Sequence, residues 1–216
     1  MKYDAIIFDL DGTLLDTLED LANSTNFALL SMGYPQRTIE EIRSFVGNGI
    51  EKLIKRALPM NCNEVDFQKA LAIFKEHYSS HCDDTTKPYA GILKLLELLA
   101  NQGICLAVVS NKIDSAVKIL CSHFFGNLIS VAIGAQEGLL KKPSSDMIFS
   151  ALQKLNVSLD RTVYIGDSEV DILTAQKAGM DMICVTWGFR DQAFLQENGA
   201  EIFANAPKDL ENLLLL

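Results

Sequence analysis

The chain has 216 residues, of which 49% are apolar, and its 28 acidic and 19 basic residues give a formal net charge of −9. This length and composition predict a globular protein with one large core and room for a smaller second module. The acidic balance argues against a nucleic-acid polymer or an anionic membrane surface as partner, because both are bound by basic patches.

The sequence also predicts the cellular location of the protein. Asp4, Asp9 and Asp11 interrupt the apolar start, and the closing run of leucines is far too short to span a bilayer. The five cysteines are scattered, odd in number and without C-x-x-C spacing, which predicts buried thiols instead of a disulfide framework or a zinc ribbon. We expect a cytoplasmic protein without a membrane partner, either monomeric or homodimeric.

A short apolar run over residues 5–8 predicts a buried parallel strand, and two acids follow it at Asp9 and Asp11. Side chains two apart on an extended segment point to the same side, so both carboxylates can face one site. Two such charges need a shared proton or a hard cation between them. Gly12 permits a positive φ or a close approach of the backbone to a ligand, and Thr13 adds a hydroxyl group. An Asp-Gly turn alone would not explain the acid at Asp9.

Residues 17–82 show one helical pattern after another, with no strand between them. Capping boxes that begin at Thr17 and Thr38 are expected to start the first two helices, and further helical faces cover residues 50–58 and 65–78. A βαβ crossover rarely takes this form, so we assign residues 17–82 to an inserted all-helical cap domain.

The rest of the chain, residues 1–16 and 83–216, is expected to form the core domain. The two connections, residues 14–18 and the polar run 83–88, could act as hinges that close the cap over the strand end carrying the two acids.

From residue 89 onward helices and strands alternate, which predicts a Rossmann-like, doubly wound parallel α/β sheet with helices on both faces. Ligands of such sheets bind outside the carboxyl ends of the strands, and Asp9, Ser110 and Asp167 each follow a predicted strand. The predicted strands cover residues 104–109, 128–133, 162–165 and 182–185, and the predicted helices cover residues 92–99, 113–124, 147–155 and 170–178.

Ser110 and Asn111 stand where a strand gives way to a helix. A hydroxyl with successive backbone N–H groups at such a turn can bind an anion, although Ser-Asn is also an ordinary helix start.

Lys141 and Lys142 precede Pro143 in a loop, and on residue type alone two lysines are more often a solvated pair than a binding site.

Asp167 and Asp171 lie four residues apart at the start of a predicted helix. Like charges at that spacing mildly destabilise a helix, so their presence at a strand end favours a nearby cation, whereas a simple helix cap would need only Asp167.

His77 and His81 have the spacing of a helical zinc pair, but we favour a surface role because no acidic ligand is evident beside them. The sequence contains neither a Ser-His-Asp constellation nor a Walker-type phosphate loop, which excludes serine hydrolase and P-loop nucleotide chemistry.

Four short motifs follow one another along the chain: D-x-D-G-T from Asp9, Ser110-Asn111, Lys142-Pro143 and G-D-S-x-x-D from Gly166. This succession resembles the motifs of the haloacid dehalogenase-like phosphohydrolases, and the resemblance spans essentially the whole chain. It implies an α/β core with an inserted helical cap, in agreement with the pattern of predicted elements.

The resemblance also implies roles for individual residues. Asp9 would be the nucleophile and Asp11 the general acid and base. Mg²⁺ would be held by Asp9, Asp167 and the backbone carbonyl of Asp11, with Asp171 supporting the site. Of the two neighbouring lysines, Lys142 matches the motif. The groups expected to bind the substrate phosphate are Gly12, Thr13, Ser110, Asn111 and Lys142.

Within the predicted cap, Gly47, Asn48 and Gly49, followed by Arg56, resemble the substrate loop of the phosphoglycolate phosphatase branch of this family. The run Trp187-Gly188-Phe189 after the last predicted strand is similar to that branch as well.

The predicted function is therefore Mg²⁺-dependent hydrolysis of a small phosphorylated metabolite through an aspartyl-phosphate intermediate, with 2-phosphoglycolate as the first candidate. A phosphomutase similar to β-phosphoglucomutase, and a pyrophosphatase or nucleotidase of the same family, remain open. A haloacid dehalogenase is disfavoured because those relatives lack an acid at the position of Asp11. A non-enzymatic phospho-switch, which would need no helical lid, is a further alternative.

Overall fold

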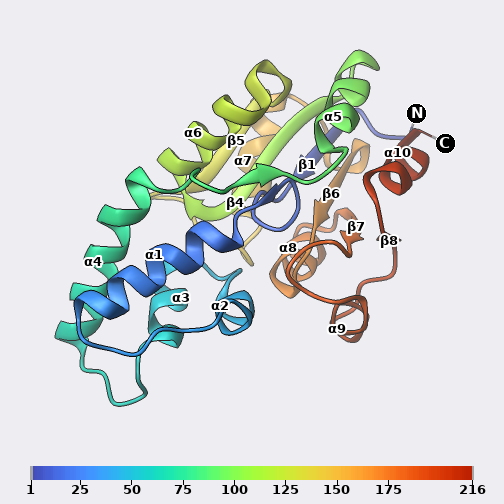
Figure 1. Cartoon of the computed structure of the whole chain (residues 1–216). Coiled ribbons are helices and arrows are strands. Elements are labelled where there is room, and N and C mark those ends of the chain that lie inside the picture. Colours follow the sequence, from blue (N-terminus) through green and yellow to red (C-terminus); the bar gives the residue numbers. More distant parts are fainter. Residues whose placement is uncertain (1, 216) are drawn as a thin grey trace. The chain divides into compact units, whose positions relative to one another are not determined.

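Two units make up the chain in this computed structural model, which describes residues 2–215 (Figure 1). The α/β unit consists of Met1–Leu15 and Pro88–Leu216, and the helical unit consists of Asp16–Lys87. The sequence analysis placed Asp16 and residues 83–87 in the core domain. They belong instead to the helical unit, where Thr85 and Thr86 donate hydrogen bonds from their backbones and hydroxyls to the Asp20 carboxylate.

A six-stranded sheet in the order β5-β4-β1-β6-β7-β8 forms the centre of the α/β unit (Figure 1). Its strands are β1 (Ala5–Phe8), β4 (Cys105–Ile113), β5 (Val131–Ala135), β6 (Thr162–Gly166), β7 (Asp181–Val185) and β8 (Phe203–Ala204). Every neighbouring pair is parallel, which confirms the predicted α/β sheet. Phe8 is level with Val108 on β4 and Ile165 on β6, so the acids that follow β1 and β6 emerge at the same edge.

Helices cover the sheet because its central strand is apolar on both faces. All four residues of β1 are fully buried, as expected for a parallel strand with helices on either side. On one face, Ile7 and Val109 pack in a cluster with Met147 and Ala151 of α7 and with Ala175 of α8. The helices of this unit are α5 (Ile92–Asn101), α6 (Asp114–Phe125), α7 (Asp146–Leu155), α8 (Glu169–Ala178), α9 (Gln192–Glu197) and α10 (Pro207–Leu215), with short 3-10 turns η1 (Gly126–Leu128) and η2 (Leu159–Arg161).

The helical unit contains four helices and no strand between them. These are α1 (Leu18–Ser31), α2 (Ile39–Phe45), α3 (Ile50–Ala57) and α4 (Glu64–Ser80). Helix α1 packs along α4, and α2 and α3 contact both neighbours in sequence. The segments at which the chain passes from one unit to the other, β2 (Leu15–Asp16) and β3 (Lys87–Pro88), pair as a two-stranded sheet. Among residues 2–215, no helix is both long and apolar enough to cross a bilayer.

Several predicted element boundaries were wrong, and some short elements were not predicted. The capping box at Thr38 is confirmed, but the one at Thr17 is not formed, since the Asp20 carboxylate bonds to Thr85 and Thr86 instead of to its own helix start. Strand β4 does not end at Val109 but continues to Ile113 beside β5, with an irregular register. The short elements β8, α9 and α10 were not predicted, because two-residue strands and short helices carry little periodic signal.

Candidate active site

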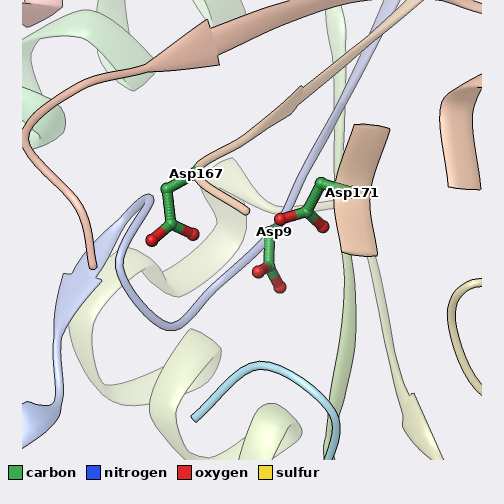
Figure 2. A group of neighbouring side chains, drawn as sticks. All are labelled: Asp9, Asp167 and Asp171. Carbon is green, nitrogen blue, oxygen red and sulfur yellow. The ribbon is translucent and has the colours of Figure 1, made fainter. Parts of the chain in front are cut away.

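Three buried aspartates meet at the edge where β1 and β6 end (Figure 2). Asp9 directly follows β1, and its backbone N–H continues the sheet ladder by donating to the Ile165 carbonyl at 2.8 Å. Asp167 directly follows β6, and Asp171 stands in the first turn of α8. One carboxylate oxygen from each lies within 4.8 Å of the others. Among the described residues, this is the one group of three or more such side chains close enough to hold a metal ion.

A single buried lysine reaches into this group. The Lys142 ammonium lies 2.8 Å from Asp9 Oδ1 and 2.7 Å from Asp171 Oδ1, and it donates to the Tyr164 hydroxyl at 3.0 Å. The lysine side chain is 2% exposed. Its backbone is held by Asn111, whose side-chain amide accepts from the Lys142 N–H at 2.8 Å and donates to the Lys142 carbonyl at 3.0 Å. The Asn111 side chain, expected at the phosphate, therefore fixes the lysine loop.

The group contains more acidic than basic side chains, and this imbalance, together with burial, shifts the pKa values of its members. Burial first, and then the Asp171 carboxylate, raise the pKa of Asp9 to about 7 against the opposite effect of Lys142. Burial and the carboxylates of Asp171 and Asp9 raise the pKa of Asp167 well above its ordinary value. For Lys142, burial alone lowers the ammonium pKa, but the two nearby carboxylates outweigh it and the pKa lies well above normal. Three carboxylates beside one ammonium leave an excess of buried negative charge.

This donor set fits Mg²⁺. Carboxylate oxygens are the ligands that this hard cation takes in proteins, and a divalent cation would offset the excess negative charge. The backbone also makes room around Asp167, because a Cβ at Gly12 or at Gly188 would collide with its carboxylate. Gly12 has a φ of 86°, which is the positive φ expected of this glycine, and its backbone passes close to the Asp167 carboxylate.

The loop after β7 closes on the same carboxylate. Phe189 donates its backbone N–H to Asp167 Oδ2 at 2.7 Å, and the Thr13 hydroxyl lies 3.3 Å from Asp167 Oδ1. Trp187 donates its indole N–H to the Thr13 carbonyl at 3.0 Å. The sequence singled out Trp187-Gly188-Phe189 only by resemblance, and its contact with the D-x-D-G-T segment had no local signal.

Asp171 is held by its own helix start. Ser168 donates its backbone N–H and its hydroxyl to Asp171 Oδ2, and the Asp171 N–H returns to the serine hydroxyl in a capping box. The Tyr164 hydroxyl donates to Asp171 Oδ1 at 2.9 Å. Tyr164 is a site residue that the sequence analysis missed, because an aromatic residue inside an apolar strand is normally part of the core.

Ser110 and Lys112 lie on the irregular end of β4. Ser110, Asn111 and Lys112 are all buried, as expected in a parallel strand that is covered by helices on both faces. The strand register shifts between Val109 and Ile113, and the Lys112 N–H donates to the Ser110 hydroxyl at 3.2 Å. The Lys112 ammonium lies 2.7 Å from Asp11 Oδ1. Lys112 is the second missed residue, and its position directly after Ser110-Asn111 was the available signal.

The predicted substrate loop lies in the helical unit and is braced by Arg56. The guanidinium donates to the Phe45 carbonyl and to Asn48 Oδ1, each at 2.6 Å. Gly47 and Gly49 have φ values of 115° and 86°, which side chains rarely allow. The loop therefore has a defined shape within its own unit.

The two histidines of the helical unit stack on one another, with ring centroids 4.2 Å apart. His77 Nδ1 lies 3.0 Å from the Ser24 hydroxyl, and His81 Nδ1 lies 2.7 Å from Asp84 Oδ2. The sequence analysis had seen no acid beside them, and Asp84 corrects that point. These residues do not form a group of metal ligands among those that the structure describes.

Comparison with known proteins gives a consistent likeness along the chain. Residues 6–185 match a family model for haloacid dehalogenase-like hydrolases. The phosphoglycolate phosphatase of Aliivibrio fischeri is 32% identical over 212 residues, which cover 95% of this chain and 93% of that enzyme. The phosphoglycolate phosphatase of Agrobacterium fabrum is 33% identical over 189 residues, which cover 86% and 81% of the two chains.

Solved structures resemble the chain over the same extent. The crystal structure of a proposed phosphoglycolate phosphatase from Lactobacillus delbrueckii subsp. bulgaricus is 37% identical, with a TM-score of 0.93 and 99% of each chain covered. The crystal structure of a predicted phosphatase from Clostridium acetobutylicum is 27% identical, with a TM-score of 0.88 and 100% of each chain covered. The likeness therefore includes the helical unit as well as the α/β unit.

Proposed function

Since the chain belongs to the haloacid dehalogenase-like hydrolase family, we propose that it hydrolyses a small phosphomonoester in two steps, with Asp9 as the nucleophile. The observation that carries this proposal is the buried group of Asp9, Asp167 and Asp171 around Lys142 at the carboxyl end of the central strand. Crowded acids with perturbed pKa values at a strand end are typical of catalytic sites, because a purely structural site would avoid their mutual repulsion.

In the first step, an Asp9 carboxylate oxygen attacks phosphorus, the bond from phosphorus to the alcohol oxygen breaks, and an aspartyl phosphate forms. Asp11 gives a proton to the departing oxygen. In the second step, Asp11 takes a proton from a water molecule whose oxygen attacks phosphorus, which releases inorganic phosphate and restores the Asp9 carboxylate.

Binding of the phosphoryl group is assigned to the groups around Asp9. The Lys142 ammonium offsets negative charge on the nucleophile and on the phosphoryl oxygens, and Asn111 keeps its backbone in place. The Ser110 hydroxyl supplies a further donor beside this strand end. The backbone N–H groups of Gly12 and Thr13, also expected at the phosphate, donate instead to the Leu15 and Leu10 carbonyls in the structure. Asp9, Asp167 and the Asp11 carbonyl would hold Mg²⁺, with Asp171 in support, and the bound cation would offset the negative charge of the phosphoryl group.

We propose 2-phosphoglycolate as the first substrate to test. The relatives of Aliivibrio fischeri and Agrobacterium fabrum, both named phosphoglycolate phosphatases, support this choice. The choice of leaving group is assigned to the helical unit, as a cap whose loop at residues 47–49 is braced by Arg56.

The test is phosphate release from a panel of 2-phosphoglycolate, p-nitrophenyl phosphate, a sugar phosphate, a nucleoside monophosphate and pyrophosphate, with and without Mg²⁺. We expect Mg²⁺-dependent release that is fastest from 2-phosphoglycolate and that Asp9→Asn abolishes. Asp4→Asn is the matched control, because Asp4 lies at the opposite end of β1 and pairs with Arg161 at the surface. Mass spectrometry of acid-quenched enzyme should detect one added phosphoryl group on Asp9.

Three outcomes would contradict parts of this proposal. Full activity of Asp9→Asn would exclude Asp9 as the nucleophile. A phosphoryl group that returns to a sugar, without accumulation of inorganic phosphate, would favour a mutase. Faster release from pyrophosphate or from a nucleoside monophosphate would reassign the substrate within the same chemistry.

A further inference from the structure

The two acids of the D-x-D-G-T segment pair with different buried lysines. Lys142 lies against Asp9, and Lys112 lies against Asp11, with Nζ to Oδ1 distances of 2.8 and 2.7 Å. The two lysines come from different segments, the loop before α7 and the end of β4. The proposed reaction gives Lys142 a task at the phosphoryl group and leaves Lys112 without one.

The course of β4 brings Lys112 to this position. The register shift after Val109 and the hydrogen bond from the Lys112 N–H to the Ser110 hydroxyl interrupt the regular strand. An irregularity of this kind re-aims side chains. On the neighbouring strand β5, a Cβ at Gly134 would lie 2.7 Å from the Lys112 carbonyl oxygen, so only glycine there allows the two backbones to pass. The sheet itself therefore directs the lysine toward Asp11.

The pair is asymmetric in exposure. The Lys112 side chain is 2% exposed and the Asp11 side chain is 15% exposed, so the lysine approaches from the buried side and the carboxylate still reaches solvent. A buried ion pair is a poor source of stability, because desolvation of both charges offsets their attraction. A charge-assisted hydrogen bond of 2.7 Å does, however, fix where the carboxylate lies.

We propose that Lys112 is a positioning residue for Asp11, holding its carboxyl group where it exchanges a proton with the leaving group. This inference rests on the proposed function. Lys112 itself transfers no proton: the proton moves from the Asp11 carboxyl to the alcohol oxygen as the bond between that oxygen and phosphorus breaks. The benefit is geometric, because proton transfer needs the donor within hydrogen-bond distance of the departing oxygen.

The proposal predicts a dependence on the leaving group. An alkoxide leaving group needs a proton, whereas p-nitrophenolate is stable without one. The test compares kcat/KM of the wild type and of Lys112→Met on 2-phosphoglycolate and on p-nitrophenyl phosphate, in the presence of Mg²⁺. This ratio reports only the steps up to departure of the alcohol, so hydrolysis of the shared aspartyl phosphate does not enter. We expect a loss of about 10- to 100-fold on 2-phosphoglycolate and of less than about threefold on the aryl ester.

Comparing two substrates on one preparation also controls for folding, because a partly unfolded sample loses both activities equally. Lys112→Arg keeps the positive charge and should recover most of the activity on 2-phosphoglycolate. Lys118→Met is the matched control: Lys118 is an exposed lysine of α6 that pairs with Asp114, and its loss should leave both values unchanged. In an Asp11→Asn background, Lys112→Met should add less than about a twofold loss, because the two residues act as one unit.

Equal losses on the two esters would overturn the positioning role and leave Lys112 as a structural residue of β4. A further large loss in the Asp11→Asn background would also overturn it. If the wild-type chain released phosphate from no member of the substrate panel, the proposed function would fail and this inference with it, whereas the two outcomes above overturn the inference alone.

Discussion

The two units bury the same kind of charged group in opposite ways. In the helical unit, Asp20 is 1% exposed, and its carboxylate accepts hydrogen bonds from the backbone N–H and the hydroxyl of both Thr85 and Thr86, at 2.6 to 3.1 Å. In the α/β unit, Asp9 is also buried, but its neighbours are two further acids and one shared lysine. One carboxylate is surrounded by neutral donors and the other by like charge.

The pKa values move apart accordingly. Burial by itself raises the pKa of Asp20, but the hydrogen bonds from Thr85 and Thr86 together outweigh it and hold the pKa below its ordinary value. Burial and the Asp171 carboxylate raise the pKa of Asp9 to about 7. A buried carboxylate that is surrounded by neutral donors is a structural anchor. Buried carboxylates that crowd together favour a bound cation and are typical of catalytic sites. The comparison predicts which substitutions affect activity and which affect stability.

The largest expected effect is on activity at Asp9. Asp9→Asn should lower phosphate release by on the order of 10⁴-fold or more, because it removes the proposed nucleophile. Without divalent cations, its free energy of unfolding should match or exceed that of the wild type, since one of three crowded charges is gone. Urea unfolding monitored by circular dichroism measures the second quantity. A clear loss of stability would mean that Asp9 is a structural anchor like Asp20.

Removal of metal should have the next largest effect. Chelation of divalent cations should reduce activity by roughly 100-fold or more, and added Mg²⁺ should restore it, because the cation contributes several kcal/mol at the developing charge. Asp167→Asn should raise the Mg²⁺ concentration needed for half-maximal activity by roughly tenfold or more. Asp20→Asn provides the contrast and should leave that concentration unchanged.

Asp20→Asn should act on stability. The amide presents an NH₂ group to donors that need an acceptor, so we expect the free energy of unfolding to fall by about 2 to 3 kcal/mol. Glu19→Gln is the matched control: Glu19 is the exposed neighbour on α1, and its substitution should change the free energy by less than about 0.5 kcal/mol. Similar values for the two variants would show that the threonine contacts contribute little.

The contribution of Asp20 should also depend on pH with a defined sign. Its folded-state pKa is below the unfolded value of about 3.9, so its stabilisation is fully present above that value and is lost as the pH falls through the folded pKa. The difference in unfolding free energy between wild type and Asp20→Asn should stay constant from neutral pH to about 5 and shrink below about 4. A difference that grew on acidification would contradict the direction of the shift.

The smallest expected effect is at Tyr164. Tyr164→Phe removes one of three hydrogen-bond partners of the Lys142 ammonium while keeping the ring in the core, so we expect about a fivefold loss of activity. Tyr3→Phe is the control, because the Tyr3 hydroxyl donates to Asp181 at the surface end of β7. Unchanged activity of Tyr164→Phe would mean that the two carboxylates alone hold the lysine.

Features with a local cause were predictable from the sequence. The apolar run before Asp9, the alternation of helices and strands after residue 89, and the spacing of Asp167 and Asp171 all depend on neighbours within a few residues. Each places a side chain on one edge of a strand or one face of a helix by fixed backbone periodicity. The parallel sheet and the meeting of Asp9 with Asp167 at its carboxyl edge follow from that periodicity together with the rule for α/β sheets.

What only the tertiary structure decided are the partners of those side chains. Lys112 reaches Asp11 across 101 positions of sequence, and Thr85 reaches Asp20 across 65. Asp20 had the spacing of a capping box, yet distant threonines compete for its carboxylate, and the continuation of β4 past Val109 depends on the strand beside it. Sequence periodicity determines which face a residue occupies. The pairing of buried charges depends on which segments the fold brings within hydrogen-bond distance, and that pairing separates a structural carboxylate from a candidate catalytic one.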